Sequence, residues 1–158
     1  MKLGRLEVEI TGSRVTFQGR IDDGSPLGTL AAQIPPGDVT LDTSGITFVN
    51  SIGMREWIRM LRVLRERGVV TLERVGDVLM TQMNLVPELA DSKTLRIASF
   101  HAQYACPKCG GESAPVVDAI ANAEALRRLA PPRLPCPECG ADMELGDFPE
   151  RYLTVFRS

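Results

Sequence analysis

Residues 39–72, VTLDTSGITFVNSIGMREWIRMLRVLRERGVVTL, decide the fold. The middle of this stretch has an apolar stripe at helical spacing, with the opposite face carrying arginines and a glutamate. The stripe consists of Met54, Trp57, Ile58, Leu61 and Leu64. Asn50 or Ser51 supplies the N-cap of the predicted helix, and Gly68 its C-terminal stop. Short apolar, β-branched runs at 39–42 and 69–72 flank the helix, so the stretch predicts a strand–helix–strand unit.

The residues before this unit predict a hairpin. Leu6, Val8 and Ile10 alternate with polar residues, and a second alternating run covers residues 15–21. Thr11-Gly12-Ser13 between them has the composition of a turn. Residues 24–37 are predicted to be a loop that contains a short helix at 27–33.

The residues after the unit predict a further helix and strand. The helix covers residues 77–84, with Asp77 as its cap and Pro87 beyond its end, and the strand covers residues 95–100. The resulting order of elements is typical of an α/β fold, with a mixed sheet and helices on at least one face.

Composition limits the classes of protein. The chain has 158 residues, of which 44% are hydrophobic and 24% charged, enough for one ordinary domain and a small appendage. A net charge of −2 does not favour binding to nucleic acid or to an anionic membrane. No apolar run is long enough for a transmembrane helix, and the N-terminus lacks a secretory core. We therefore expect a cytoplasmic protein.

The only four cysteines form two similar knuckles, Cys106-Pro107-Lys108-Cys109-Gly110 and Cys136-Pro137-Glu138-Cys139-Gly140. In a reducing compartment, paired cysteines at this spacing are typical of metal ligands rather than disulfides. Four thiolates make a tetrahedral site that suits structural Zn²⁺. Redox chemistry of the Cys-x-x-Cys type is the alternative, and a catalytic zinc would need an open position. The glycine after each knuckle is expected to relieve crowding of a Cβ atom.

The two knuckles resemble a zinc ribbon, with 26 residues between them. We therefore predict a zinc-ribbon extension at residues 101–158, with an inserted helix at 116–129 and a strand at 143–145. Zinc ribbons often bind nucleic acid, but acidic residues outnumber basic ones in this part of the chain. Nucleic-acid binding is therefore not favoured.

The first hundred residues resemble a STAS domain (sulfate transporter and anti-sigma factor antagonist). The resemblance is strongest over residues 39–89 and rests on the order and spacing of several short motifs. These are Gly19-Arg20-Ile21-Asp22 at a strand end, residues 39–46 as a strand and turn, Phe48-Val49-Asn50-Ser51-Ile52-Gly53 at the start of the main helix, and the strand at 68–75. The resemblance implies a STAS-like mixed sheet with helices over residues 1–100.

The resemblance also implies a function. Anti-sigma factor antagonists of this family are not enzymes; they bind a serine kinase or another scaffold, and their serine at this helix start can be phosphorylated. That serine corresponds to Ser51, whereas Asn50 replaces the usual Asp and Ile52 a common Ser or Thr. A phosphate there would be tolerated by the positive end of the helix dipole. The alternative is that Asn50 or Ser51 only caps the helix.

The sequence thus predicts a non-enzymatic bacterial signalling adaptor that binds a protein partner around Ser51 and carries a structural zinc. A nucleic-acid-associated regulator that uses the zinc ribbon is the alternative function. The single histidine, His101, has no nucleophile or carboxylate at catalytic spacing, and no Gly-rich phosphate loop follows a strand. The sequence does not identify the partner or the oligomeric state.

Overall fold

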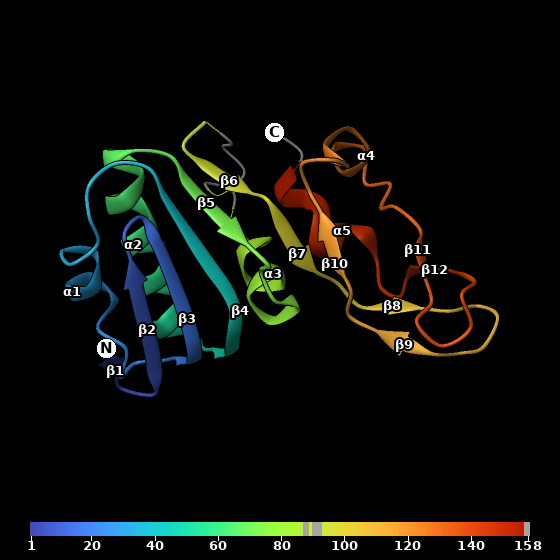
Figure 1. The fold of residues 1–158 in the computed structure, drawn as a ribbon, viewed down its shortest axis with the longest axis horizontal. Coiled ribbons are helices and arrows are strands. Elements are labelled where there is room, and N and C mark those ends of the chain that lie inside the picture. The colour runs from blue at the N-terminus through green and yellow to red at the C-terminus, as the bar shows by residue number, and fades with distance from the viewer. Residues whose placement is uncertain (87–88, 90–92, 157–158) are drawn as a thin grey trace.

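The computed structural model of the chain describes residues 1–86, 89 and 93–156. Its largest sheet has six strands in sequential order (Figure 1): β1 (Lys2–Leu3), β2 (Leu6–Thr11), β3 (Arg14–Ile21), β4 (Val39–Val49), β5 (Val70–Glu73) and β6 (Leu95–Ile97). Strands β1 to β3 are antiparallel to one another, whereas β3 to β6 are parallel. The predicted α/β class with a mixed sheet is confirmed, as is the N-terminal hairpin.

One face of this sheet is buried by helices. The helix α1 (Leu27–Ala31) packs on α2 (Ser51–Arg67), and α2 packs on β3, β4 and β5. The indole of Trp57 meets Phe17 of β3 edge to face, with ring centroids 5.4 Å apart. Gln18 and Thr71 point to the opposite face, where Gln18 is exposed and Thr71 half-buried. Burial on one face is what the alternating pattern of the strands predicts.

The main helix α2 begins and ends where the sequence predicts. The Asn50 side chain accepts a hydrogen bond of 2.7 Å from the amide of Gly53, so Asn50 rather than Ser51 is the N-cap. The helix ends at Arg67, before Gly68. Of the predicted apolar stripe, all but the half-buried Ile58 are buried.

Strand β4 is longer than the sequence indicates. The predicted strand at 39–42 and turn at 43–46 form one continuous strand to Val49, with two register shifts against β3. An aspartate at position 42 is typical of the end of a strand. In the structure, however, its carboxylate accepts hydrogen bonds from the amide and the hydroxyl of Ser44. The polar residues are therefore satisfied locally, and the chain continues along the sheet.

The helix α3 (Asp77–Met83) confirms the second predicted helix but not its cap. The N-cap position is Gly76, and no side chain caps the helix. Asp77 lies in the first turn, where its carboxylate accepts from the side chain of Gln103 at 3.0 Å. Pro87, placed beyond the helix end, lies outside the described residues.

The predicted strand at 95–100 is divided. After β6 the chain continues as β7 (Ser99–His101), which pairs antiparallel with β10 (Val116–Asp118). The helix predicted at 116–129 is therefore wrong for its first half; only α4 (Ala123–Arg127) is helical. The composition of 116–129 favours a helix, but a distant strand provides a partner for Val116 and Val117. The carboxylate of Asp118 then accepts from two following amides and turns the chain.

The C-terminal part forms a four-stranded sheet of order β11-β12-β8-β9, made of β8 (Tyr104–Ala105), β9 (Glu112–Ser113), β11 (Leu134–Pro135) and β12 (Asp142–Leu145). The predicted strand at 143–145 is thus confirmed. The chain ends in α5 (Pro149–Leu153) and a 3-10 helix (Thr154–Phe156), and α5 packs on α3. Phe156 lies 5.4 Å from Phe100 between ring centroids. The predicted division at residue 100 is therefore spanned by packing of apolar side chains.

None of the helices in the described part of the chain combines the length and apolar character that crossing a bilayer requires.

Candidate metal centre

The two cysteine knuckles have nearly the same backbone geometry. Each lies at the tip of a hairpin, the first between β8 and β9 and the second between β11 and β12. In the first knuckle the amide of Cys106 donates to Gly111 at 2.8 Å, and the amide of Gly110 donates back to Cys106 at 2.9 Å. The equivalent bonds at Cys136 measure 2.7 and 2.9 Å. Pairing of β12 with β8 brings the two hairpins side by side.

The four sulfur atoms converge on one point. All lie within 4.8 Å of one another, with 3.5 Å between Cys106 and Cys139 and 3.7 Å between Cys109 and Cys136. A tetrahedral ion with metal–sulfur bonds of about 2.3 Å places its sulfur ligands about 3.8 Å apart. The observed spacing therefore fits a four-coordinate metal ion. The four cysteines form a candidate metal site, and all four ligands come from the positions that the sequence predicts.

The pKa values of the clustered thiols also favour binding of a cation. The amide of Cys109 donates to the Cys106 sulfur and, against the effect of burial, lowers the pKa of Cys106 to about 7. The pKa of Cys109 is raised to about 12, because the Gly111 amide lowers it less than the neighbouring thiols raise it. One thiolate suppresses ionisation of the next when no positive charge lies between them. A metal ion removes this penalty, since its charge stabilises all the thiolates together.

The glycines that follow the knuckles have a different role from the one the sequence suggests. A Cβ atom on Gly110 or Gly140 would meet no atom within 4 Å, so crowding does not explain them. Both have left-handed backbones, with φ of +75° and +76°. Such a conformation strains residues that carry a Cβ. Backbone conformation therefore selects glycine at these positions.

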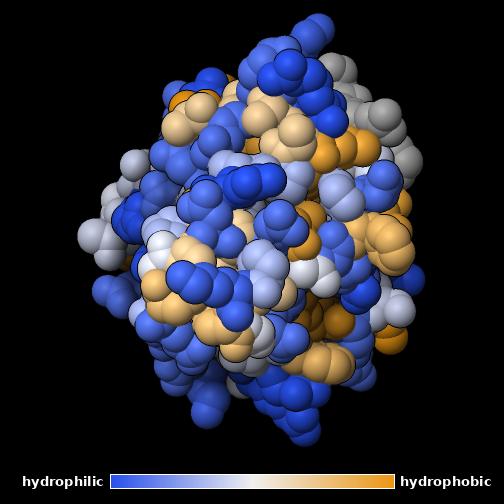
Figure 2. All heavy atoms as spheres, turned by 90° about the vertical axis from the view of Figure 1, so that its right-hand side faces the viewer, coloured by the Kyte–Doolittle hydropathy of each residue, from blue (hydrophilic) through white to orange (hydrophobic). Residues whose placement is uncertain are grey.

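A four-sulfur set of this kind leaves no coordination position for a substrate. Cys106 and Cys136 are buried, whereas Cys109 and Cys139 are exposed. The Glu138 carboxylate lies 3.9 Å from the Cys109 sulfur, and Arg133 pairs with Glu144 at 3.8 Å. Hydrophilic residues cover much of this end of the molecule, with smaller hydrophobic patches between them (Figure 2).

The predicted partner site is separate from the metal centre. Figure 1 shows α2 and the strands of the cysteine hairpins at opposite ends of the molecule. Ser51, the first residue of α2, is exposed, and within the described residues its hydroxyl makes no hydrogen bond. Asn50 is half-buried, and its side chain caps α2.

The sequence patterns did not indicate an ionic cluster around the buried carboxylate of Asp42. The Asp42 side chain, only 3% exposed, pairs with Arg74 and also with Arg14 at 3.3 Å. Arg14 pairs in turn with Glu73 at 2.8 Å. Burial would raise the pKa of Asp42, but the hydrogen bonds from Arg74 and Ser44 outweigh it and lower the pKa. An aspartate within an apolar, β-branched run is the signal that could have indicated the cluster.

His101 is half-buried, and one ring nitrogen lies 2.8 Å from the carbonyl of Ala114. This contact ties β7 to the segment that precedes β10.

Comparisons with known proteins leave the family open. No protein-family model matches the chain, and no curated protein matches its sequence.

Proposed function

We propose that this protein is a non-enzymatic bacterial signalling adaptor, similar to anti-sigma factor antagonists of the STAS family, that acts in the cytoplasm. It binds a protein partner, such as a serine kinase or a signalling scaffold, around Ser51. The observation that carries the proposal is the exposed hydroxyl of Ser51 at the start of a 17-residue helix that Asn50 already caps. Because Asn50 satisfies the amide of Gly53, Ser51 is not needed as a cap and is left for a second role.

The surroundings of Ser51 support binding of a protein. We define the helix-start surface as Arg20, Phe48, Ser51 and Ile52. The guanidinium of Arg20 lies 3.9 Å from the centroid of the Phe48 ring, and Ile52 is 45% exposed. These residues come from the carboxyl ends of β3 and β4 and the start of α2, the edge at which open α/β sheets commonly bind ligands. An arginine, an aromatic ring and an exposed apolar side chain together are typical of interface anchors.

Phosphorylation of Ser51 is the proposed control. A phosphate adds about −1.5 to −2 charge at pH 7, which the positive end of α2 accommodates. The fold is thereby preserved, while the charge of the helix-start surface is changed. Binding is expected to change without loss of stability.

We further infer that the four cysteines hold one structural Zn²⁺. The donor set is all sulfur, which favours zinc over harder divalent ions, and the hairpins that carry the ligands are too short to be stable alone. Elemental analysis of the purified protein should give about one zinc per chain. Cys139→Ala is expected to lose the ion, whereas Cys139→His is expected to retain it because a Cys₃His set also binds zinc. Protein free of zinc, or retention by Cys139→Ala, would contradict the inference.

The adaptor proposal is tested by affinity capture with wild-type, Ser51→Asp and Thr29→Asp proteins as bait. Thr29 is an exposed residue of α1, so Thr29→Asp is a matched control for added charge. We expect a protein partner that is retained by wild type and by Thr29→Asp and is lost with Ser51→Asp, with unchanged thermal midpoints. Equal binding by all three baits would show that Ser51 has no part in recognition. Sub-micromolar binding of nucleic acid at 200 mM salt would instead support the alternative regulator.

A further inference from the structure

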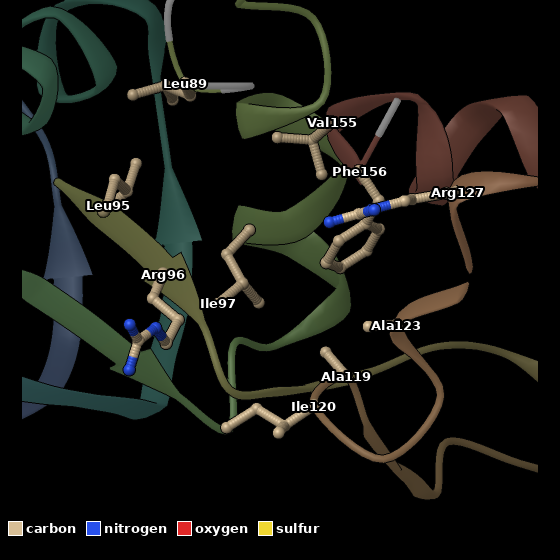
Figure 3. Close-up of a pocket in the computed structure, with 10 residues that line it drawn as sticks. All are labelled: Leu89, Leu95, Arg96, Ile97, Ala119, Ile120, Ala123, Arg127, Val155 and Phe156. Atoms are coloured by element: carbon tan, nitrogen blue, oxygen red, sulfur yellow. The ribbon is translucent and has the colours of Figure 1, made fainter. Parts of the chain in front are cut away.

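A pocket of about 360 Å³ lies between the main sheet and the C-terminal part, away from the cysteines and from Ser51. Its walls come from β6, the turn after β10, the helix α4 and the 3-10 helix at the end of the chain (Figure 3). The lining is largely apolar, including Ile97, Ala119, Val155 and Phe156. A volume of this size is in the range of small-molecule sites.

The pocket lies where β10 ends, because β10 pairs with β7 and does not continue along β6. Strand β10 pairs with β7, and the amide of Ala119 makes one further bond of 2.9 Å to Ala98. Asp118 then turns the chain toward α4, so the chain leaves the sheet beside the carboxyl end of β6. In the described part of the chain, no strand pairs with the outer edge of β6. The outward backbone groups of Leu95 and Ile97 therefore add a few polar atoms to an apolar wall.

Two arginines, Arg96 and Arg127, belong to the lining of this pocket, but only Arg127 directs its guanidinium into it. Figure 3 shows the Arg127 side chain reaching from α4 past Phe156 with its guanidinium directed inward, whereas Arg96 points away on the other side of β6. Within the described residues the side chain of Arg127 has no ion pair and no hydrogen bond. A guanidinium without a partner beside apolar walls pairs favourably with a single carboxylate. A phosphate-binding site would be expected to have several converging donors.

We propose that this pocket binds a small apolar carboxylate, with its carboxylate on Arg127 and its hydrocarbon part against Ile97, Val155 and Phe156. The site is independent of the adaptor proposal, since neither Ser51 nor the cysteines line it. Its far wall, α4, belongs to the segment between the two cysteine knuckles. Metal binding therefore fixes both ends of the segment that closes the pocket.

The test uses the full zinc-loaded chain and octanoate as the probe, with octylammonium and octanol as charge controls. Calorimetry should show saturable binding of octanoate and much weaker binding of the other two. Arg127→Gln should weaken octanoate binding on the order of tenfold or more, because a charge-assisted bond is lost. Arg128→Gln is the matched control, since Arg128 is the next residue along the chain, is exposed and does not line the pocket.

A second variant tests the location. Ala123 is an exposed residue of α4 that lines the pocket, so Ala123→Trp should fill the space and abolish octanoate binding without unfolding the chain. Amide shifts of Ile97 and Ala119 on titration should appear in wild type and vanish in Ala123→Trp. The proposal is overturned if octanoate does not bind, if octylammonium binds equally well, or if Arg128→Gln weakens binding as much as Arg127→Gln.

Discussion

Asp42 is a charged residue within an otherwise apolar, β-branched run of the sequence. It lies within β4 and is almost fully buried, yet Arg74, Arg14 and Ser44 all bond its carboxylate. Its partners come from β3, from β4 itself and from the residue that follows β5. The carboxylate of Asp42 thus links three neighbouring strands of the sheet.

This arrangement predicts a pH-dependent contribution to stability. The pKa of Asp42 is lower in the folded chain than in the unfolded chain, where it is near 3.9. Its contribution is therefore present above pH 4 and lost as pH falls through the folded pKa. Asp42→Asn should lower the free energy of unfolding by about 1–3 kcal/mol at pH 7, and the deficit should shrink toward pH 3. Urea titrations at several pH values, followed by the single tryptophan, measure this difference.

Asp23→Asn is the matched control, since Asp23 is an exposed carboxylate in the loop after β3. It should show little loss of stability at any pH. A deficit for Asp42→Asn that stays constant from pH 7 to pH 3 would contradict the pairing described above.

At the scale of elements, the start of α2 is held against β3 by a backbone contact. A Cβ atom on Gly53 would lie 2.3 Å from the carbonyl oxygen of Ile21. Backbone atoms cannot move aside as a flexible side chain can, so the helix must shift if Gly53 is replaced. The same contact sets the position of Ser51 on the helix-start surface.

Gly53→Ala should therefore be strongly destabilising, by about 3 kcal/mol or more, because overpacking here forces a backbone shift. Gly28 offers the matched control, since it also lies in a helix but a Cβ there would meet no atom within 4 Å. Gly28→Ala should leave stability unchanged or raise it by up to about 1 kcal/mol. Thermal unfolding of the two variants compares them directly. Equal effects would show that the Ile21 contact does not constrain the helix.

The elements also show why part of the fold was predictable and part was not. Helix α2 and the cysteine knuckles depend on residues close in sequence, so periodicity and spacing were sufficient to predict them. Strand β10 depends on β7, and nothing within residues 116–129 reveals that partner. The pairing of Asp42 with Arg74 joins residues 32 apart along the chain, and local patterns do not encode it. The predicted cap of α3 was wrong because an aspartate is as favourable in the first turn of a helix as at its N-cap, and Asp77 lies in the first turn.

At the scale of the whole molecule, hydrogen bonds and apolar packing join the C-terminal part to the N-terminal part of the chain. The Asn84 side chain donates to the carbonyl of Glu150 at 2.6 Å and accepts from the amide of Val155 at 2.7 Å. The packing of Phe100 on Phe156 adds an apolar contact beside them. These contacts do not involve the cysteine hairpins. Packing of the last helices thus joins the C-terminal part to the main sheet, whereas the candidate metal site would join only the two cysteine hairpins to each other.

Removal of the metal should separate these two contributions. Structural zinc is worth an apparent ~10–16 kcal/mol in small fingers, and strands of two to four residues do not hold hairpins together without it. A strong chelator should therefore abolish hydrogen-exchange protection at residues 104–113 and 134–145, while the amides of α2 stay protected. The fluorescence of Trp57, which is buried between α2 and β3, should change little, and added Zn²⁺ should restore protection. Loss of the Trp57 signal together with the metal would show instead that the chain unfolds as one cooperative unit, and the predicted division at residue 100 would then fail.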